Sequence, residues 1–275
     1  WRPKNAGKRF SKRPGPCEKP QTKTKSALAS GGREPVVREE DVPRHVPYGI
    51  ALLAAIARDA GHLVQVYDAN AWRMGEDILR QVLEADNWDV IALGGITTAY
   101  GSAKSIIGTA RETCPEAVIV LGGGLLTSMP RDMMAWLPAV DVGVIGEAFI
   151  TWPEILEMVD AGDRDWSQIP GTISRKDNGA LIMSAQRELL NDLDSLPYPA
   201  WDFFPLEEVY FKNSEVLFSE EGMLAQRRID INASYGCSLV CKFCFHLGIA
   251  GDMRYEEDSD GVVNPRFDVP GNHTR

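Results

Sequence analysis

Short apolar runs that alternate with helical segments restrict the fold of this chain more than any other feature of its sequence. Between residues 47 and 161, runs rich in Val, Ile and Leu alternate with segments that have the periodicity of helices. This alternation predicts a doubly wound α/β domain, in which helices cover both faces of a parallel sheet. The predicted strands are 63–67, 89–93, 117–121 and 141–145, and the predicted helices are 48–60, 77–85, 103–113, 131–137 and 151–161.

Glycine follows three of these predicted strands. Ligands of open α/β sheets bind outside the carboxyl ends of the strands, and glycine lets the backbone come close to a bulky ligand. Glycine is also ordinary turn chemistry, so each cluster alone is a weak sign of a site. Neither a Gly-x-Gly-x-x-Gly fingerprint nor a Gly-Lys-Ser/Thr phosphate loop is present. The three clusters are Gly94-Gly95, Gly122-Gly123-Gly124 and Gly146-Glu147.

Three of the five cysteines, Cys237, Cys241 and Cys244, lie within eight residues of one another. Thiolates this close can converge on one metal centre, and soft sulfur ligands favour zinc, Cu(I) or iron–sulfur clusters. A closed zinc site needs four ligands, whereas a 4Fe–4S cluster held by three thiolates keeps one open iron. His246 could serve as a fourth zinc ligand only if the same short loop wrapped the metal. Free or redox-active thiols are a further alternative.

The motif Cys-x-x-x-Cys-x-Phe-Cys, preceded by the β-prone stretch 228–234, resembles the signature of the radical S-adenosylmethionine enzymes. The resemblance implies that the three cysteines hold a 4Fe–4S cluster on the loop after the first strand of a (β/α) barrel. It also implies that S-adenosylmethionine binds the open iron and that one-electron reduction cleaves it to a 5′-deoxyadenosyl radical. Phe243 is expected near the adenine, with an ordinary core position as the alternative.

The α/β segment resembles the cobalamin-binding domain that precedes the radical barrel in a large subclass of these enzymes. The resemblance covers about residues 47–245 and includes Val120-Leu-Gly-Gly-Gly124 and Val144-Ile-Gly-Glu147. It implies that Thr97, Thr98 and Tyr100 lie on the loop under the corrin ring and that the other two glycine clusters flank the nucleotide tail. The Asp-x-His-x-x-Gly motif of a lower axial histidine is absent. His62 precedes a predicted strand and is interpreted as structural.

Four parts are expected along the chain. They are a disordered basic head (1–46), the cobalamin-binding α/β domain (47–165), a connector with a hairpin (166–227) and the truncated start of the radical barrel (228–275). Asn178-Gly179 predicts a type I′ turn in that hairpin. Trp201 and the pair Phe203-Phe204 are expected to anchor a Pro-rich strap.

Both ends of the chain depart from the family pattern. The family domain begins with a central strand, but no convincing apolar run lies in residues 1–46, and a missing central strand would leave its neighbours' backbone groups unpaired. At the other end, thirty-one residues follow Cys244, and the stretch from Arg254 is interpreted as polar loop. We therefore expect an amino-terminal fragment that is inactive alone.

Charge and cysteine usage narrow the function further. Residues 1–46 carry twelve Lys and Arg against five Asp and Glu, so the rest of the chain has a net charge of −17, which disfavours nucleic-acid binding. An odd cysteine count, with no signal peptide or apolar membrane span, favours a reducing cytoplasm. The expected function is cobalamin-dependent radical methyl transfer to a carbon of a small-molecule substrate, with a one-electron reductant such as flavodoxin or ferredoxin. The alternatives are a cobalamin carrier or sensor with a vestigial cluster loop, and a zinc-stabilised interaction protein.

Overall fold

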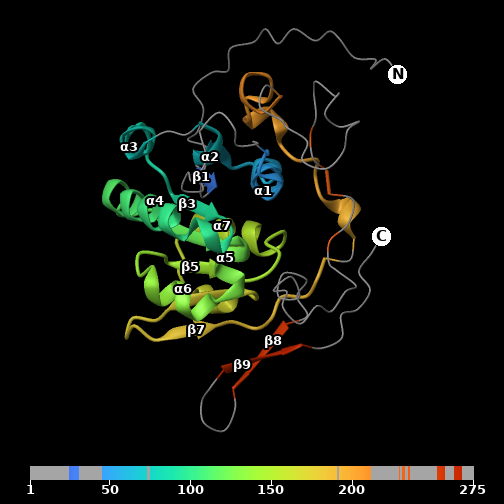
Figure 1. The fold of residues 1–275 in the computed structure, drawn as a ribbon. Helices are drawn as coiled ribbons and strands as arrows, with labels where there is room; N and C mark the ends of the chain where they lie inside the picture. The colour runs from blue at the N-terminus through green and yellow to red at the C-terminus, as the bar shows by residue number, and fades with distance from the viewer. Residues whose placement is uncertain are drawn as a thin grey trace, which may run out of the picture.

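A computed structural model describes residues 25–30, 45–72, 75–190, 192–211, 253–257 and 263–267, and also residues 229, 231, 232 and 235. Its centre is a seven-stranded sheet in the order β2-β1-β3-β4-β5-β6-β7 (Figure 1). The strands are β1 (Lys25–Ser30), β2 (Leu63–Asp68), β3 (Val90–Gly94), β4 (Val118–Gly122), β5 (Val142–Val144), β6 (Thr172–Arg175) and β7 (Leu181–Met183). The helices are α1 (Tyr48–Asp59), α2 (Ala69–Trp72), α3 (Glu76–Glu84), α4 (Tyr100–Thr113), α5 (Gly123–Ser128), α6 (Pro130–Trp136) and α7 (Thr151–Asp160).

Helices cover both faces of the sheet, which confirms the predicted α/β class. Successive strand residues point to opposite faces, so one strand contributes to two cores. Val90 and Ala92 of β3 belong to a core with α1 and α7. Ile91 and Leu93 of the same strand belong to a second core with α3, α4, α5 and α6. The apolar runs of β3, β4 and β5 are continuous because both faces of these central strands are buried.

The strand β1 corrects the expectation that residues 1–46 hold no strand. Residues 25–30 pair in parallel with β2 on one side and β3 on the other, in the register Leu28↔Val66 and Leu28↔Ala92. Ser26 and Ala27 are buried there. Ala27 packs into the core with α3 and α4, and the alanine-rich helix α1 also contacts β1. The central strand of the domain is therefore present.

The edge of the sheet corrects a second expectation. The first five strands of the sheet order, β2 to β5, run parallel to one another. The sequence predicts that β5 is the last strand and that the following hairpin belongs to a connector. Instead β6 pairs antiparallel with β5, in the register Gly143↔Ile173, and β7 pairs with β6. Ile173 is fully buried, so the hairpin completes the core. Its turn is also not type I′, because Gly179 donates its N–H to the Lys176 carbonyl and has φ +83°, which gives a three-residue loop.

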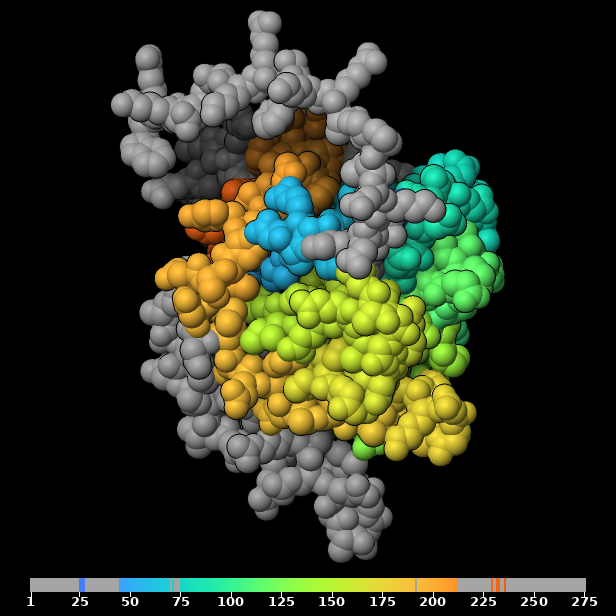
Figure 2. Space-filling view, turned by 180° about the vertical axis from the view of Figure 1, so that it is seen from behind, coloured from blue at the N-terminus to red at the C-terminus, as the bar shows by residue number. Residues whose placement is uncertain are grey.

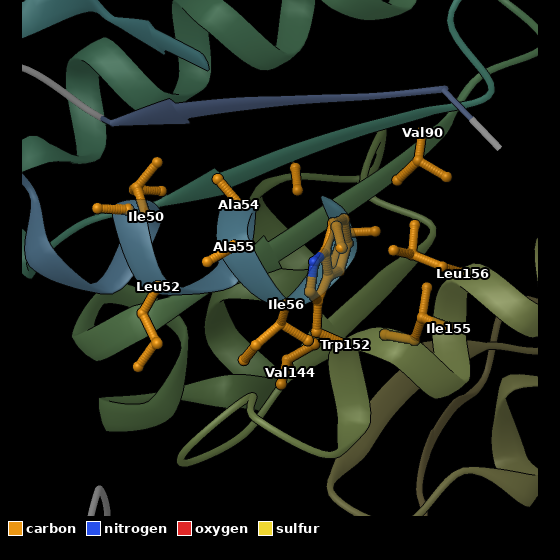
Figure 3. Close-up of a cluster of buried hydrophobic side chains, with 14 of the residues drawn as sticks. Ile50, Leu52, Ala54, Ala55, Ile56, Val90, Val144, Trp152, Ile155 and Leu156 are labelled. Atoms are coloured by element: carbon orange, nitrogen blue, oxygen red, sulfur yellow. The ribbon is translucent and has the colours of Figure 1, made fainter. Parts of the chain in front are cut away.

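Trp152 of α7 joins the two helices on one face of the sheet. Its side chain is 1% exposed, and its Nε1 donates a 3.2 Å hydrogen bond to the Leu53 carbonyl of α1. Figure 3 shows the indole beside Ile56 of α1 and near Val144 of β5. Burying this indole and satisfying its N–H together hold α1 against α7.

Residues 186–190 and 192–211, called the strap below, run beside α7 and α1 (Figure 2, orange). Arg187 forms an ion pair with Glu154 of α7, the Ala200 N–H bonds the Ala51 carbonyl of α1, and Asp202 pairs with Arg58. The strap ends in a π-helical turn, Leu206–Tyr210. Trp201 packs on Tyr48, the Arg58 guanidinium lies over the Phe203 ring, and Phe204 is buried, which confirms that these aromatics anchor the strap.

Two segments further along the chain differ from expectation. Residues 253–257 and 263–267 form an antiparallel pair, β8 (Met253–Glu257) and β9 (Val263–Phe267), where a polar loop was expected. Charged residues are common on strands paired on one side only, which is why this pair was missed. Ile229, Ile231 and Asn232, within the expected first barrel strand, have no strand conformation and are exposed.

Candidate cofactor-binding edge

The carboxyl ends of β3, β4 and β5 bring the three predicted glycine clusters to one edge of the sheet. In the register of β3 and β4, Gly94 lies opposite Gly122. Strand β5 follows β4 and leads into Gly146 and Glu147. The parallel arrangement therefore places residues about fifty positions apart in sequence beside one another, as the strand pattern predicted.

Gly95 and Gly123 touch through their backbones. Gly123 has φ +74°, and a Cβ built on it would lie 2.9 Å from the Gly95 carbonyl oxygen. The same carbonyl accepts a 2.8 Å hydrogen bond from the Leu125 N–H at the start of α5. Any side chain at Gly123 would push these two loops apart. Glycine is therefore required both by the close contact with the Gly95 backbone and by the positive φ angle.

Thr127 connects the second and third loops. Its Oγ1 accepts a 3.1 Å hydrogen bond from the Gly146 N–H, and its side chain is buried. Gly146 has φ +79°, which turns the chain away from β5. Thr127 carries no local sequence signal, and only the pairing of β4 with β5 reveals its role.

Glu147 is the one carboxylate among the predicted edge residues. Desolvation by burial raises its pKa from 4.5 to about 7. Near neutral pH the side chain therefore exchanges between a neutral acid and a carboxylate. An acidic group in this state can hold or release a proton at the edge.

The loop after β3 is the outer rim of the edge. Thr97 and Thr98 are exposed on a 3-10 turn, Thr97–Ala99, and the Thr97 hydroxyl lies 3.5 Å from the Ser128 hydroxyl. Tyr100 begins α4 and packs edge-on against Trp136 of α6, with ring centroids 6.0 Å apart. These three residues lie beside the glycines, and Gly124 lies in the first turn of α5.

His62 lies away from this edge. It precedes β2, is buried, and its Nδ1 is 3.8 Å from Asp160 Oδ2 at the end of α7. This position agrees with the structural interpretation. The loops 94–100, 122–129 and 146–149 contain no histidine.

Cys237, Cys241, Cys244 and Phe243 lie outside the described residues, but Tyr235 lies within them. The Tyr235 ring packs edge-on against Phe149, with centroids 5.0 Å apart and an interplanar angle of 74°. Burial raises the pKa of Tyr235, and Asn232 and Tyr48 hydrogen-bond with its hydroxyl. The residue two positions before Cys237 is therefore docked on the loop that follows β5.

Within the ranges given above, no group of three or more His, Cys, Asp and Glu side chains is arranged to hold a metal ion. Nor does any helix in the described part of the chain have the length and apolarity needed to span a membrane.

Comparison with known proteins agrees with this geometry. Residues 35–156 match the family model of the B12 binding domain. An uncharacterized methyltransferase of Pyrococcus horikoshii is 26% identical over 72% of this chain and 40% of its own length. The anaerobic magnesium-protoporphyrin IX monomethyl ester cyclase of Rubrivivax gelatinosus is 25% identical over 77% of this chain and 37% of its own.

A solved structure shares the fold. The radical S-adenosylmethionine methyltransferase TsrM of Kitasatospora setae, with cobalamin and a [4Fe-4S] cluster bound, superposes with a TM-score of 0.52 at 20% identity. The match covers 59% of this chain and 31% of TsrM. This chain thus spans less than half the length of each of these three proteins. Residues 35–156 are thus similar to the B12 binding domain, in a chain that shares its fold with part of a radical S-adenosylmethionine methyltransferase.

Proposed function

We propose that this chain binds cobalamin, a 4Fe–4S cluster and S-adenosylmethionine, and acts in radical methyl transfer to a carbon of a small molecule. One observation carries the proposal. The glycine loops after β3, β4 and β5 meet at one edge, and Tyr235, two residues before the first motif cysteine, docks on the third of these loops.

The residues present fit cobalamin. Glycine at 95 and 123 lets the first two loops meet through their backbones, and an edge rich in glycine would let a flat ring come close to the main chain. Exposed hydroxyls of Thr97 and Thr98 offer hydrogen bonds beside it. Because these loops lack histidine, cobalt would have no imidazole ligand from them. The residues proposed to surround cobalamin are Gly94, Gly95, Thr97, Thr98, Tyr100, Gly122, Gly123, Gly124, Gly146 and Glu147.

The cysteine motif fits a cluster through the chemistry of its donors. Cys237, Cys241 and Cys244 would supply three thiolates, and Phe243 would pack near the adenine of S-adenosylmethionine. When bound, the cluster would supply the electron that cleaves S-adenosylmethionine, and cobalamin would supply the methyl group. Hydrogen bonds join the three glycine loops, and burial raises the pKa of Glu147 to about 7, so this side chain could accept or release a proton there.

Cluster reduction needs a one-electron donor such as flavodoxin or ferredoxin. We also propose a cytoplasmic location, because oxidising compartments favour disulfides over free thiolates.

Cyclisation is the second candidate reaction, because the Rubrivivax gelatinosus relative is a cyclase. The two reactions share the edge and the cysteine motif and differ in the substrate. Substrate screening with methyl-labelled S-adenosylmethionine distinguishes them, because only methylation transfers the label.

The edge is tested by a blocking substitution. Thr98→Trp places an indole on the exposed rim and should lower hydroxocobalamin retention after gel filtration by about tenfold or more. Glu116→Trp is the matched control, because Glu116 is exposed just before β4, at the opposite end of the sheet. Equal retention in both variants would contradict the assignment of the edge. A reconstituted chain that holds cobalamin but no iron would favour a cobalamin carrier or sensor. A chain that holds stoichiometric zinc but neither cobalamin nor iron would favour a zinc-stabilised interaction protein.

A further inference from the structure

Tyr235 is the partly buried member of its segment. Among the described residues 229, 231, 232 and 235, it packs against the core that contains α1 and α7. Ile231 is 75% exposed, and Ile229 and Asn232 are exposed too. An apolar residue left in solvent close to a partly buried tyrosine indicates that the contact made by Tyr235 is specific to that side chain.

The partners of Tyr235 come from two rigid elements. Tyr48 is the first residue of α1, and Phe149 precedes α7, whose first turn is closed by the hydrogen bond from the Trp152 N–H to the Ala148 carbonyl. Phe149 is itself buried. The Tyr235 ring therefore packs edge-on against Phe149, and its hydroxyl is hydrogen-bonded to Tyr48, so contacts at both the ring and the hydroxyl hold the side chain in place.

The cysteine motif begins only two residues after Tyr235, so the contacts of Tyr235 also restrict where the motif can lie. Consecutive Cα atoms are about 3.8 Å apart, so the Cys237 Cα lies within about 7 Å of the Tyr235 Cα. By the same measure the Gly146 Cα lies within about 11 Å of the Phe149 Cα. The Tyr235–Phe149 contact thus links the first thiolate to the glycine edge by a short path.

We propose that Tyr235 is a positioning residue that clamps the cluster-binding segment to the loop after β5 and so sets the separation between the cluster and cobalamin. The inference rests on the proposed function, since it concerns the spacing of the two cofactors. The clamp acts through Phe149 and Tyr48, which do not touch the reacting atoms. Reactions between two bound groups depend steeply on such spacing, because a misplacement of about 1 Å can cost about a hundredfold in rate.

The contact itself is tested without cofactors. The full chain and the variants Tyr235→Ala, Phe149→Ala and the double variant are unfolded in urea as a double-mutant cycle. A real aromatic pair should give a coupling of about two- to tenfold in the unfolding equilibrium constant. Additive effects would overturn the clamp whether or not any cofactor binds. If Tyr235→Ala does not fold, Tyr235→Leu and Phe149→Leu replace the alanines in the cycle.

The consequence is tested in the reconstituted full chain. Electron paramagnetic resonance of reduced cluster and cob(II)alamin measures the dipolar coupling between the two centres. Tyr235→Ala should keep the iron and cobalamin content of the wild type, while the distribution of distances between cluster and cobalt broadens or shifts. The distribution of Tyr235→Phe should lie between those of the wild type and Tyr235→Ala. Tyr198→Ala, on a 93% exposed side chain of the strap, should match the wild type. An unchanged distribution in Tyr235→Ala would overturn the proposal. A wild type that keeps neither cofactor would refute the proposed function, and the urea cycle would still decide the clamp.

Discussion

The Tyr210 hydroxyl donates a 2.5 Å hydrogen bond to Asp68 Oδ2, and both side chains are buried. Asp68 ends β2 and also accepts the Ala71 N–H through Oδ1. Tyr210 is the last residue of the π-helical turn in the strap, 142 residues later in the chain. A buried carboxylate is stable only when its oxygens have donors, so this bond fixes the end of the strap against the sheet.

Tyr210→Phe removes this donor and keeps the ring. We expect the free energy of unfolding to fall by about 1–3 kcal/mol, because Asp68 keeps its burial and loses a charge-assisted bond. Urea unfolding measures the loss, with Tyr198→Phe on the exposed part of the strap as the control. A loss no larger than that of the control would show that the bond contributes nothing.

Gly123→Ala tests the approach of the first two loops. The added Cβ would meet the Gly95 carbonyl at 2.9 Å and adopt φ +74°, so we expect a loss of about 1–3 kcal/mol in unfolding free energy. Gly108→Ala in the middle of α4 is the matched control, because nothing lies within 4 Å of its Cβ position. The control should gain up to about 1 kcal/mol. Equal effects at the two glycines would contradict the close contact.

Glu147→Gln tests the partly buried acid. The folded chain binds this proton more tightly than the unfolded chain, because the pKa rises from 4.5 to about 7 on folding. The stabilisation is full below pH 4.5 and is lost as the pH rises through about 7. Between about pH 5 and about pH 8 the wild type should therefore lose more stability than Glu147→Gln. Urea unfolding across this window measures the difference, and Glu157→Gln on the exposed side of α7 should keep the wild-type profile. Parallel profiles for wild type and Glu147→Gln would contradict the raised pKa.

Arg187→Met tests how the strap begins. The guanidinium forms an ion pair with Glu154 and also donates from Nε to the Thr151 hydroxyl and the Pro170 carbonyl. The side chain is 16% exposed, so we expect a loss of about 3 kcal/mol in unfolding free energy. Arg80→Met removes an exposed ion pair with Glu112 and should cost less than about 1 kcal/mol. Equal losses would mean that the partial burial of Arg187 adds nothing.

The sequence pattern predicted most of the sheet, because β3, β4 and β5 are apolar runs buried on both faces and the edge strand β2 is also rich in apolar residues. It failed at β1, where Lys-Ser-Ala-Leu-Ala-Ser contains a single large aliphatic residue. That segment is a strand because β2, β3 and α1 surround it, a tertiary effect that local propensity does not carry. The hairpin was detected from its turn residues, but its pairing with β5 depends on contacts across the sheet.

The candidate site divides in the same way. Glycines at strand ends are a local signal, and the structure brings all three clusters together. Thr127 and Phe149 give no such signal, because their roles arise only when neighbouring loops meet. The three motif cysteines lie outside the described residues and remain a prediction from spacing and resemblance.

Anaerobic reconstitution with iron, sulfide and hydroxocobalamin tests the central claim most directly. After gel filtration, the wild-type chain should carry about four iron atoms and about one cobalamin, as expected for one cluster and one B12 site. Cys241→Ala should lose most of the iron and keep the cobalamin, because the two cofactors use separate residues. Iron content unchanged by Cys241→Ala, or a wild-type chain that holds neither iron nor cobalamin, would contradict the account.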